Sequence, residues 1–211
     1  MGIDKPLQGK IVTSTDSVKR LDLYAETNLP TRHGLFRCIV FRDSKGLEHV
    51  AMVQGNIEGQ SRVLCRVHSE CLTSEVFGSL KCDCKEQLDS ALDLIHTQGR
   101  GLVLYLRQEG RGIGLGNKVR AYALQEKGFD TVDANEVLGL PVDARDFGIA
   151  AAMLHQLGVE SIELLTSNPL KIRALETAGV VVFRKKLDTP SISNEARAYV
   201  SVKQKRLGHL K

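Results

Sequence analysis

Three cysteines lie close together in the run CLTSEVFGSLKCDC, residues 71–84: Cys71, Cys82 and Cys84. Because Cys82 and Cys84 are two apart, one loop or strand end can direct both sulfurs at a single ion, while Cys71 must come from a separate turn. Thiolates favour zinc among the common metals. A structural zinc site is normally closed by four protein ligands, whereas a catalytic site keeps a position for water, whose pKa the metal lowers to about 7. The three cysteines therefore predict a zinc site with an open position.

Other interpretations of this cluster stay open on the sequence. His68 could be a fourth ligand and close the site, or His68 and Glu70 could flank an open metal as polar partners. The His68-Ser69-Glu70 run also matches the H-x-E part of the zinc deaminase pattern. The rest of that pattern is absent, because the cysteine pair is C-x-C and no proline precedes Cys82. Deamination is therefore a rival hypothesis.

A glycine-rich loop, RQEGRGIGLG, covers residues 107–116 and is followed by Asn117 and Lys118. Backbone N–H groups can meet phosphate where a strand leads through such a loop into a helix. The cations Arg107, Arg111 and Lys118 strengthen that interpretation, since charged side chains bind phosphate well. Glu109 would repel phosphate, so we expect its carboxylate to accept hydrogen bonds from the N–H edge of a guanine. A solvated flexible loop is the plainer alternative.

Two further stretches carry groups that suit an anionic ligand. Asp143 and Arg145 are two apart near an expected helix start, where both can face one site; a capping Asp beside a surface Arg is the alternative. The run TSNPLK, residues 166–171, links a strand to a helix, and its hydroxyls, amides and Lys171 could bind an anion. A plain connection is the alternative there.

The composition limits the classes of function. The chain has 211 residues, 42% of them apolar, and a mild net charge of +4, which suits an anionic small molecule as well as nucleic acid. It has no Trp and no basic stripe interleaved with aromatic residues, so we expect no nucleic-acid binding. It has neither a signal-peptide core nor a stretch of about 20 apolar residues, so we expect a cytoplasmic protein with no membrane partner.

The five cysteines are an odd number, and a reducing cytosol disfavours disulfides, so clustered cysteines favour a metal. Cys38 and Cys65 stand alone in apolar stretches, and we expect both to be small core residues.

The elements that must position these residues change character along the chain. We predict strands over 35–41, 49–55 and 62–67 with a turn at 44–46, so that Cys71 lies just past a strand. In the second part, helices and strands alternate. We predict a helix over 84–99 ended by Gly99, a strand over 102–106, and two helices, one capped by Asn117 and one by Asp143. A strand over 161–165, a helix that begins at Asn168 and Pro169 and is ended by Gly179, and a surface helix within 188–209 follow. This order predicts a single α/β domain with a mixed sheet, antiparallel N-terminal strands being followed by alternating helices and strands.

Taken together, these stretches resemble the GTP cyclohydrolase II family over roughly residues 20–210. The matching pieces, in family order, are RVHSECLTSEVFGSLKCDC, YLRQEGRGIGLGNKVRAYALQ, DTVDAN, PVDARDFGIAA, LLTSNPLK and the tail RLGHL. Lys85 stands where many relatives have Gly. The resemblance implies one family domain over 1–211, with flexible ends at about 1–10 and 205–211, and a homodimer.

The resemblance implies that GTP is hydrolysed to 2,5-diamino-6-ribosylamino-4(3H)-pyrimidinone 5′-phosphate, formate and pyrophosphate, the first committed step of riboflavin synthesis. It implies zinc on the three cysteines and Mg²⁺ with the triphosphate. Tyr122 is the implied ring-opening residue, Asp143 a proton acceptor, and Arg145 a nucleophile on the α-phosphorus. Because arginine keeps its proton in proteins, Arg145 could equally stabilise charge on the transferring group while water attacks. The implied GTP contacts are Arg66, Val67, His68, Ser69, Glu70, Gln87, Glu109, Gly110, Arg111, Thr131, Thr166 and Lys171.

Three other functions remain to be distinguished from this one. They are a zinc-dependent nucleotide deaminase, a non-catalytic zinc module that binds nucleic acid, and a relative that converts GTP to a different product. Tyr122 is retained, which favours the usual reaction of the family.

Overall fold

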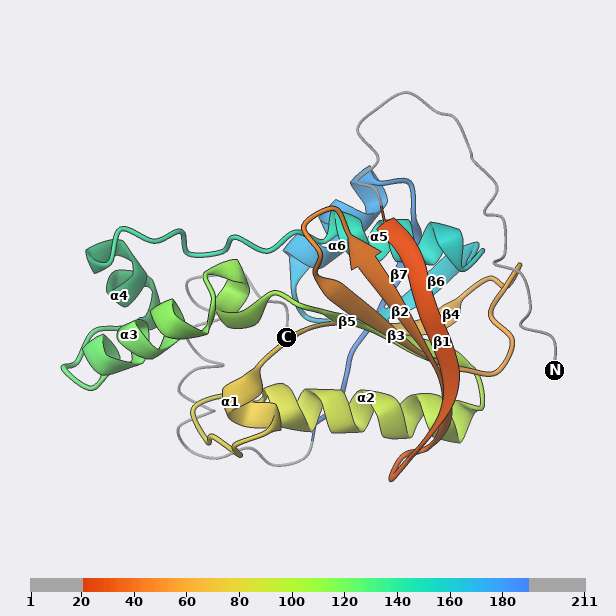
Figure 1. Cartoon of the computed structure of the whole chain (residues 1–211), viewed down its shortest axis with the longest axis horizontal. Coiled ribbons are helices and arrows are strands. Elements are labelled where there is room, and N and C mark those ends of the chain that lie inside the picture. The colour runs from red at the N-terminus through yellow and green to blue at the C-terminus, as the bar shows by residue number, and fades with distance from the viewer. Residues whose placement is uncertain (1–20, 190–211) are drawn as a thin grey trace, which may run out of the picture.

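A computed structural model describes residues 21–189 of the chain. Its centre is one mixed sheet of seven strands in the order β1-β2-β3-β5-β4-β6-β7 (Figure 1). The strands are β1 (Leu21–Thr31), β2 (Gly34–Asp43), β3 (Glu48–Gln54), β4 (Val63–Ser69), β5 (Gly101–Leu106), β6 (Ser161–Leu165) and β7 (Val181–Lys185). The pairs β1–β2, β2–β3 and β3–β5 are antiparallel, while β5–β4, β4–β6 and β6–β7 are parallel. The predicted α/β fold with antiparallel strands first is confirmed.

Helices cover both faces of this sheet, and others project from one end of the molecule (Figure 1). They are α1 (Leu72–Glu75), α2 (Cys84–Gln98), α3 (Leu115–Gln125), α4 (Thr131–Val137), α5 (Gly148–Gln156) and α6 (Pro169–Thr177), with a 3-10 turn at Glu109–Gly112. On one face Ala91, Leu92 and Ile95 of α2 form a core with Phe36 and Val103 of the sheet. The larger core on the other face includes α5 and the strands β2 to β6. Both faces of the parallel strands are therefore buried, as their continuous apolar runs require.

Several predicted boundaries are confirmed by local geometry. Gly99 follows α2 in the left-handed conformation, with φ 70°, which costs a glycine little. Asn168 caps α6 by accepting a hydrogen bond from the backbone N–H of Leu170, and Pro169 occupies the first turn. Gly179 follows α6 with φ 83°. Cys65 is fully buried in the core as expected, and Cys38 is partly buried.

Two predicted helix caps are wrong. The helix expected to begin at Asn117 begins at Leu115 after Gly114, and the Asn117 side chain donates to the backbone oxygen of Ile113. The helix expected to begin at Asp143 begins at Gly148, because Asp143 pairs with Arg145 and leaves the segment between them non-helical. A carboxylate can cap a helix or bind a nearby guanidinium, and sequence spacing does not decide between them.

Four elements have no counterpart in the sequence prediction: β1, α1, α4 and β7. Strand β1 is exposed along nearly its whole length and contains Pro30, a residue that sheets accept mainly on edge strands. It forms because its backbone pairs with β2 at the edge of the sheet. The predicted helix within 188–209 and the predicted flexible ends at about 1–10 and 205–211 lie outside the described residues, apart from the first two residues of the former.

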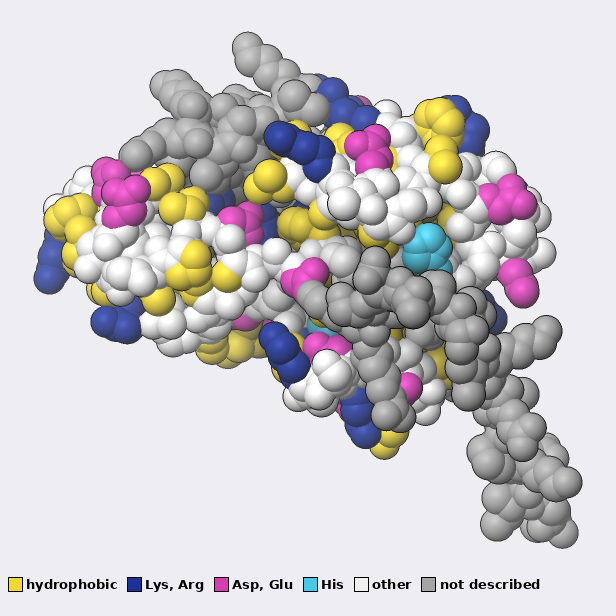
Figure 2. All heavy atoms as spheres, turned by 90° about the horizontal axis from the view of Figure 1, so that it is seen from above, with side chains coloured by type: hydrophobic (Ala, Val, Ile, Leu, Met, Phe, Trp, Pro, Cys, Tyr) yellow, Lys and Arg dark blue, Asp and Glu magenta, His cyan; other side chains and the backbone are white. Residues whose placement is uncertain are grey.

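Helices α3 and α4 project from one end of the molecule (Figure 1). Hydrophobic side chains are exposed there among charged ones, including Val119, Phe129 and Val137 (Figure 2). Within residues 21–189, none of the helices has the length and apolar character needed to cross a bilayer.

The cap of α6 gives a direct test of this local geometry. Replacement Asn168→Ala removes the acceptor for the Leu170 N–H, so we expect the free energy of unfolding to fall by about 1 kcal/mol. The matched variant Asn168→Asp retains an acceptor and should stay close to the parent. Urea denaturation of the three proteins measures the difference, and equal stability of Asn168→Ala and the parent would contradict the assigned cap.

Candidate functional site

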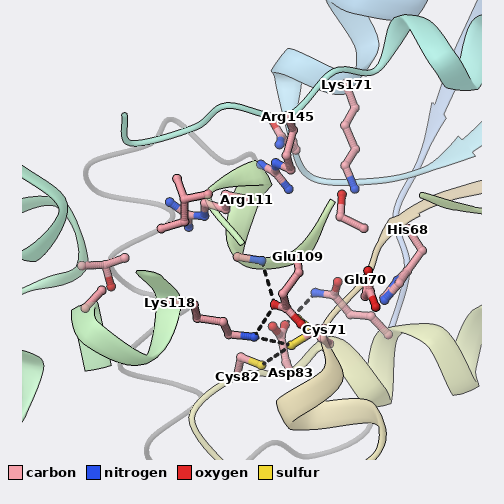
Figure 3. A pocket seen from close by; sticks show the side chains of 18 of the residues that line it. His68, Glu70, Cys71, Cys82, Asp83, Glu109, Arg111, Lys118, Arg145 and Lys171 are labelled. Atoms are coloured by element: carbon pink, nitrogen blue, oxygen red, sulfur yellow. Dashed lines mark hydrogen bonds and ion pairs between the residues drawn. The ribbon is translucent and has the colours of Figure 1, made fainter. Parts of the chain in front are cut away.

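A pocket lies at the carboxyl ends of the parallel strands β5, β4 and β6. Because parallel strands end at one edge of a sheet, the segments that follow Ser69, Leu106 and Leu165 converge there. The pocket brings together every predicted site residue except Val67 and Asp143: Arg66, His68, Ser69, Glu70, Cys71, Cys82, Cys84, Gln87, Glu109, Gly110, Arg111, Tyr122, Thr131, Arg145, Thr166 and Lys171 all line it. Residues that are far apart in the sequence thus line one cavity (Figure 3).

The three cysteines form the cluster that their spacing predicted. Their sulfur atoms all lie within 4.8 Å of one another, and those of Cys71 and Cys82 are 3.6 Å apart. Thiolates that share a tetrahedral zinc at about 2.3 Å lie about 3.8 Å apart, so the cluster fits a zinc ion. Hydrogen bonds from Cys82 and Cys84 and the charge of Lys118 hold the pKa of Cys71 well below its ordinary value, which favours the thiolate that a metal needs.

His68 does not belong to this cluster. Its Nε2 lies 2.8 Å from a carboxylate oxygen of Glu75, and the group of potential metal ligands in the described part of the chain holds the three cysteines without it. This geometry supports three protein ligands and a position open to water or substrate over a site closed by histidine.

Lys118, which was expected to be one of the phosphate-binding cations, contacts the cysteine cluster and Glu109. Its Nζ lies 2.8 Å from Glu109 Oε1 and 3.1 Å from Cys71 Sγ, which joins the glycine-rich loop to the cysteine cluster (Figure 3). Burial lowers the pKa of Lys118, but its bonds to the Glu109 carboxylate and to Cys71 outweigh burial and the pKa is raised. Its charge therefore lies between the Glu109 carboxylate and the cysteine cluster.

Glu109 is held from three sides. Its Oε2 accepts from the backbone N–H of Leu72, and its Oε1 accepts from Lys118 and from the backbone N–H of Gly110. The carboxylate thus links the start of α1, the loop and α3. Its contact with guanine stays a prediction.

The cations of the glycine-rich loop separate in the structure. Arg107 donates to Glu70 at 2.9 Å and is not among the residues lining the pocket, whereas Arg111 lines it. Arg111 has φ 57°, a left-handed conformation that is rare for a residue with a side chain and is typical of functional loops.

The loop is also docked onto the segment that carries Arg145. The backbone oxygen of Arg111 accepts from Ala144 N at 2.9 Å. Gln108 bridges the same two regions, because its amide donates to Ser69 Oγ and accepts from Asp146 N. These bonds fix the direction in which Arg145 enters the pocket.

Asp143 and Arg145 form a bidentate ion pair. Nε of Arg145 lies 2.9 Å from Asp143 Oδ1, and Nη2 lies 2.6 Å from Oδ2. Burial raises the pKa of the Asp143 carboxyl, but the hydrogen bonds and charge of Arg145 outweigh it and the pKa is lowered. Asp143 does not line the pocket itself; it orients the arginine that does.

A second cationic group lies at the ends of β4 and β6. Arg66 is buried, donates to the backbone oxygen of Leu165 and bonds the Gln87 side chain. Burial lowers its pKa to about 10, so it keeps its charge at neutral pH. Lys171 donates to the backbone oxygen of Val67 at 2.7 Å. The Val67 side chain itself lies in the core, so it does not face a ligand in the pocket.

Tyr122 and Thr131 come from the projecting helices α3 and α4. Both line the pocket, with Lys81 Nζ 4.8 Å from the centre of the Tyr122 ring. The predicted ring-opening residue therefore shares the cavity with the cysteines.

Some lining residues had no predicted role, among them Asp83 and Asn135. Asp83 accepts from Gln87 at 2.7 Å and so helps to place it. Asn135 is 3% exposed, and its Oδ1 has no hydrogen-bond partner. Asn135 lies in the DTVDAN run that contains Thr131, and this run was the only feature of the sequence that could have indicated a place for Asn135 in the pocket.

Comparison with known proteins agrees with the resemblance. Residues 22–186 match the family described as GTP cyclohydrolase II. The chain is 48% identical over 190 residues to "GTP cyclohydrolase-2" of Neisseria meningitidis serogroup C, which covers 90% of this chain and 96% of that protein.

Longer relatives share the same region. The chain is 53% identical over 194 residues to "Riboflavin biosynthesis protein RibBA" of Salinispora tropica, covering 91% of this chain and 48% of that protein. It is 47% identical over 210 residues to "Monofunctional riboflavin biosynthesis protein RIBA 3, chloroplastic" of Arabidopsis thaliana, covering 95% of this chain and 41% of that protein. The chain thus spans about half the length of these two relatives or less.

Gly112 tests the docking of the loop onto the Arg145 segment. It has φ 85°, and a Cβ added there would lie 2.8 Å from the carbonyl group of Ala144. We expect Gly112→Ala to lower the free energy of unfolding by at least about 1–2 kcal/mol, because of the left-handed backbone and this clash.

The control is Gly116→Ala, in α3, where an added Cβ meets no atom within 4 Å. It should leave the free energy of unfolding unchanged or raise it by up to about 1 kcal/mol. Chemical denaturation compares the two variants, and a Gly112→Ala protein as stable as Gly116→Ala would refute the close approach.

Proposed function

Because the chain belongs to the GTP cyclohydrolase II family, we propose that it hydrolyses GTP to 2,5-diamino-6-ribosylamino-4(3H)-pyrimidinone 5′-phosphate, formate and pyrophosphate, an early step of riboflavin synthesis. One observation carries the proposal: three cysteines that could hold a metal ion and several Arg and Lys side chains that suit phosphate line the same pocket. A base and a triphosphate on one nucleotide need such a combination.

The formate half of the reaction belongs to the cysteine end of the pocket. Loss of C8 from guanine requires two hydrolytic steps, one that opens the imidazole ring and one that removes the formyl group. Zinc on Cys71, Cys82 and Cys84 would supply a Lewis acid for the attack of water on C8. The Tyr122 phenol lines the same cavity and would orient the ring by hydrogen bonding.

The pyrophosphate half belongs to the cationic end. Arg66, Arg111 and Lys171 would bind the triphosphate, and Mg²⁺ would neutralise part of its negative charge. Arg145 would act on the α-phosphorus. Its bidentate pair with Asp143 favours a guanidinium that keeps its proton, so stabilisation of charge on the transferring group fits the geometry better than nucleophilic attack by arginine.

The proposal includes a homodimer in the cytoplasm, as the family resemblance implies. Light scattering on the purified protein measures the oligomeric state. A nucleotide deaminase and a relative with a different product are the alternatives, and the identity of the released small molecules separates them, since a deaminase would yield ammonia in place of formate.

Arg145 is the first test of the mechanism. We expect Arg145→Lys and Arg145→Ala to lower the rate of pyrophosphate release by about 10²- to 10³-fold, because the planar fork that meets the transferring group is lost. Release is followed by a coupled phosphate assay with GTP, Mg²⁺ and zinc. Full release in Arg145→Ala would remove the residue from the mechanism, and a nucleotidyl adduct on Arg145 in mass spectra would favour the covalent route.

The cysteine cluster is the second test. We expect Cys82→Ser to lose zinc and formate release while it still releases pyrophosphate from GTP, because Arg145 lies on a different segment. Metal analysis, formate and pyrophosphate are measured on the same preparation, with Cys38→Ser, outside the cluster, as the control. Formate release at the parental rate from a zinc-free Cys82→Ser protein would exclude the metal from ring opening.

A further inference from the structure

Beside the pocket, three polar side chains form a connected group: His68 of β4, Glu75 of α1 and Tyr105 of β5. The Nε2 atom of His68 lies 2.8 Å from Glu75 Oε1, and the Tyr105 hydroxyl donates to Glu75 Oε2 at 2.5 Å. The His68 and Tyr105 rings are stacked, with centres 5.7 Å apart and an interplanar angle of 18°. The side chains of His68 and Glu75 are 3% and 10% exposed. Neither Glu75 nor Tyr105 has a role in the reaction described above.

These contacts determine which ring nitrogen of His68 carries the proton. Burial and the neighbouring Glu75 raise the pKa of Tyr105, so its hydroxyl keeps its proton and donates to the carboxylate. Burial lowers the pKa of His68, so the imidazole is neutral at neutral pH, with one donor and one acceptor nitrogen. Because an ionised carboxylate has no hydrogen to donate, the 2.8 Å contact with Glu75 Oε1 makes Nε2 the donor, and the lone pair lies on Nδ1.

The Nδ1 atom is buried and has no hydrogen-bond partner in the structure, while His68 is one of the side chains that line the pocket (Figure 3). An acceptor left unpaired in a buried site costs free energy. A ligand with an N–H or O–H group at this position would remove that cost. GTP, the substrate of the proposed function, has such groups on the guanine N1 and 2-amino positions and on the ribose.

We propose that Glu75, held by Tyr105, is a positioning residue that fixes His68 as the Nε2–H tautomer, so that Nδ1 accepts a hydrogen bond from an N–H or O–H group of the bound nucleotide. The inference rests on the proposed function for the identity of the ligand. It adds a specificity element, since a nucleotide without the matching donor leaves Nδ1 unpaired.

The tautomer is measured first, without substrate. In the zinc-loaded protein with ¹⁵N-labelled histidine, long-range ¹H–¹⁵N spectra distinguish a protonated ring nitrogen from an unprotonated one, and the His68→Phe variant assigns the signals. We expect protonated Nε2 and unprotonated Nδ1 in the parent and in Glu75→Asp. We expect Glu75→Leu, which offers no acceptor, to lose this signature. A protonated Nδ1 in the parent, or an unchanged spectrum in Glu75→Leu, would overturn the proposal whether or not GTP is turned over.

Kinetics then tests the contact with the nucleotide. We expect Glu75→Leu and His68→Phe to lower kcat/KM for GTP by about tenfold or more, chiefly through KM, with Glu75→Asp retaining most of it. The control is Glu48→Gln, which alters an exposed glutamate paired with Arg42 and should match the parent. Circular dichroism confirms that each variant is folded. Parental KM in a folded His68→Phe protein would contradict the proposed contact.

Analogues that each lack one donor identify the group that Nδ1 meets: inosine 5′-triphosphate, 1-methyl-GTP, 2′-deoxy-GTP and 3′-deoxy-GTP. The analogue that binds poorly to the parent but is bound as well as GTP by His68→Phe lacks the partner of Nδ1. If His68→Phe weakens the binding of GTP and all four analogues equally, His68 does not contact these groups and the proposal fails.

Discussion

Parallel pairing of β5, β4 and β6 is the constraint on which the site depends. Parallel strands in one sheet all end at the same edge, so the segments after Ser69, Leu106 and Leu165 must meet in space although they are far apart in the sequence. The antiparallel strands β1 to β3 extend the sheet on one side. Helix α2 on one face and α5 on the other bury the parallel strands.

The segments that meet at this edge are arranged so that several largely buried charges have a partner of opposite charge. The pocket contains several cations and several carboxylates, and buried charges are tolerated when they are paired or hydrogen-bonded. Lys118 lies between Glu109 and the Cys71 sulfur, and Asp143 holds Arg145 through two bonds. These pairs divide the pocket into a sulfur-rich end, suited to a metal, and a cationic end, suited to phosphates. A nucleotide that reacts at both its base and its triphosphate matches this division.

Much of the fold was predictable because local patterns dictated it. The apolar runs of β2 to β6, the glycine after α2 and the Asn-Pro start of α6 are local signals, and each element lies where those signals placed it. Strand β1 was missed because it is an exposed edge strand, formed by its partner's backbone and not by its own apolar residues. The caps at Asn117 and Asp143 were misassigned because each side chain has another partner within a few residues.

The sequence by itself determined the chemistry that was available. The spacing of Cys71, Cys82 and Cys84 indicates a three-thiolate site, and the loop motifs supply the cations, because residue types and short spacings fix which ligands and charges can be offered. Only the tertiary structure decided how these groups are used. It turned Lys118 toward the cysteines, placed Val67 in the core, and joined His68 to Glu75 and Tyr105. Those outcomes depend on which side chains from distant segments lie within hydrogen-bonding distance, and that distance is set by the packing of the sheet and its helices.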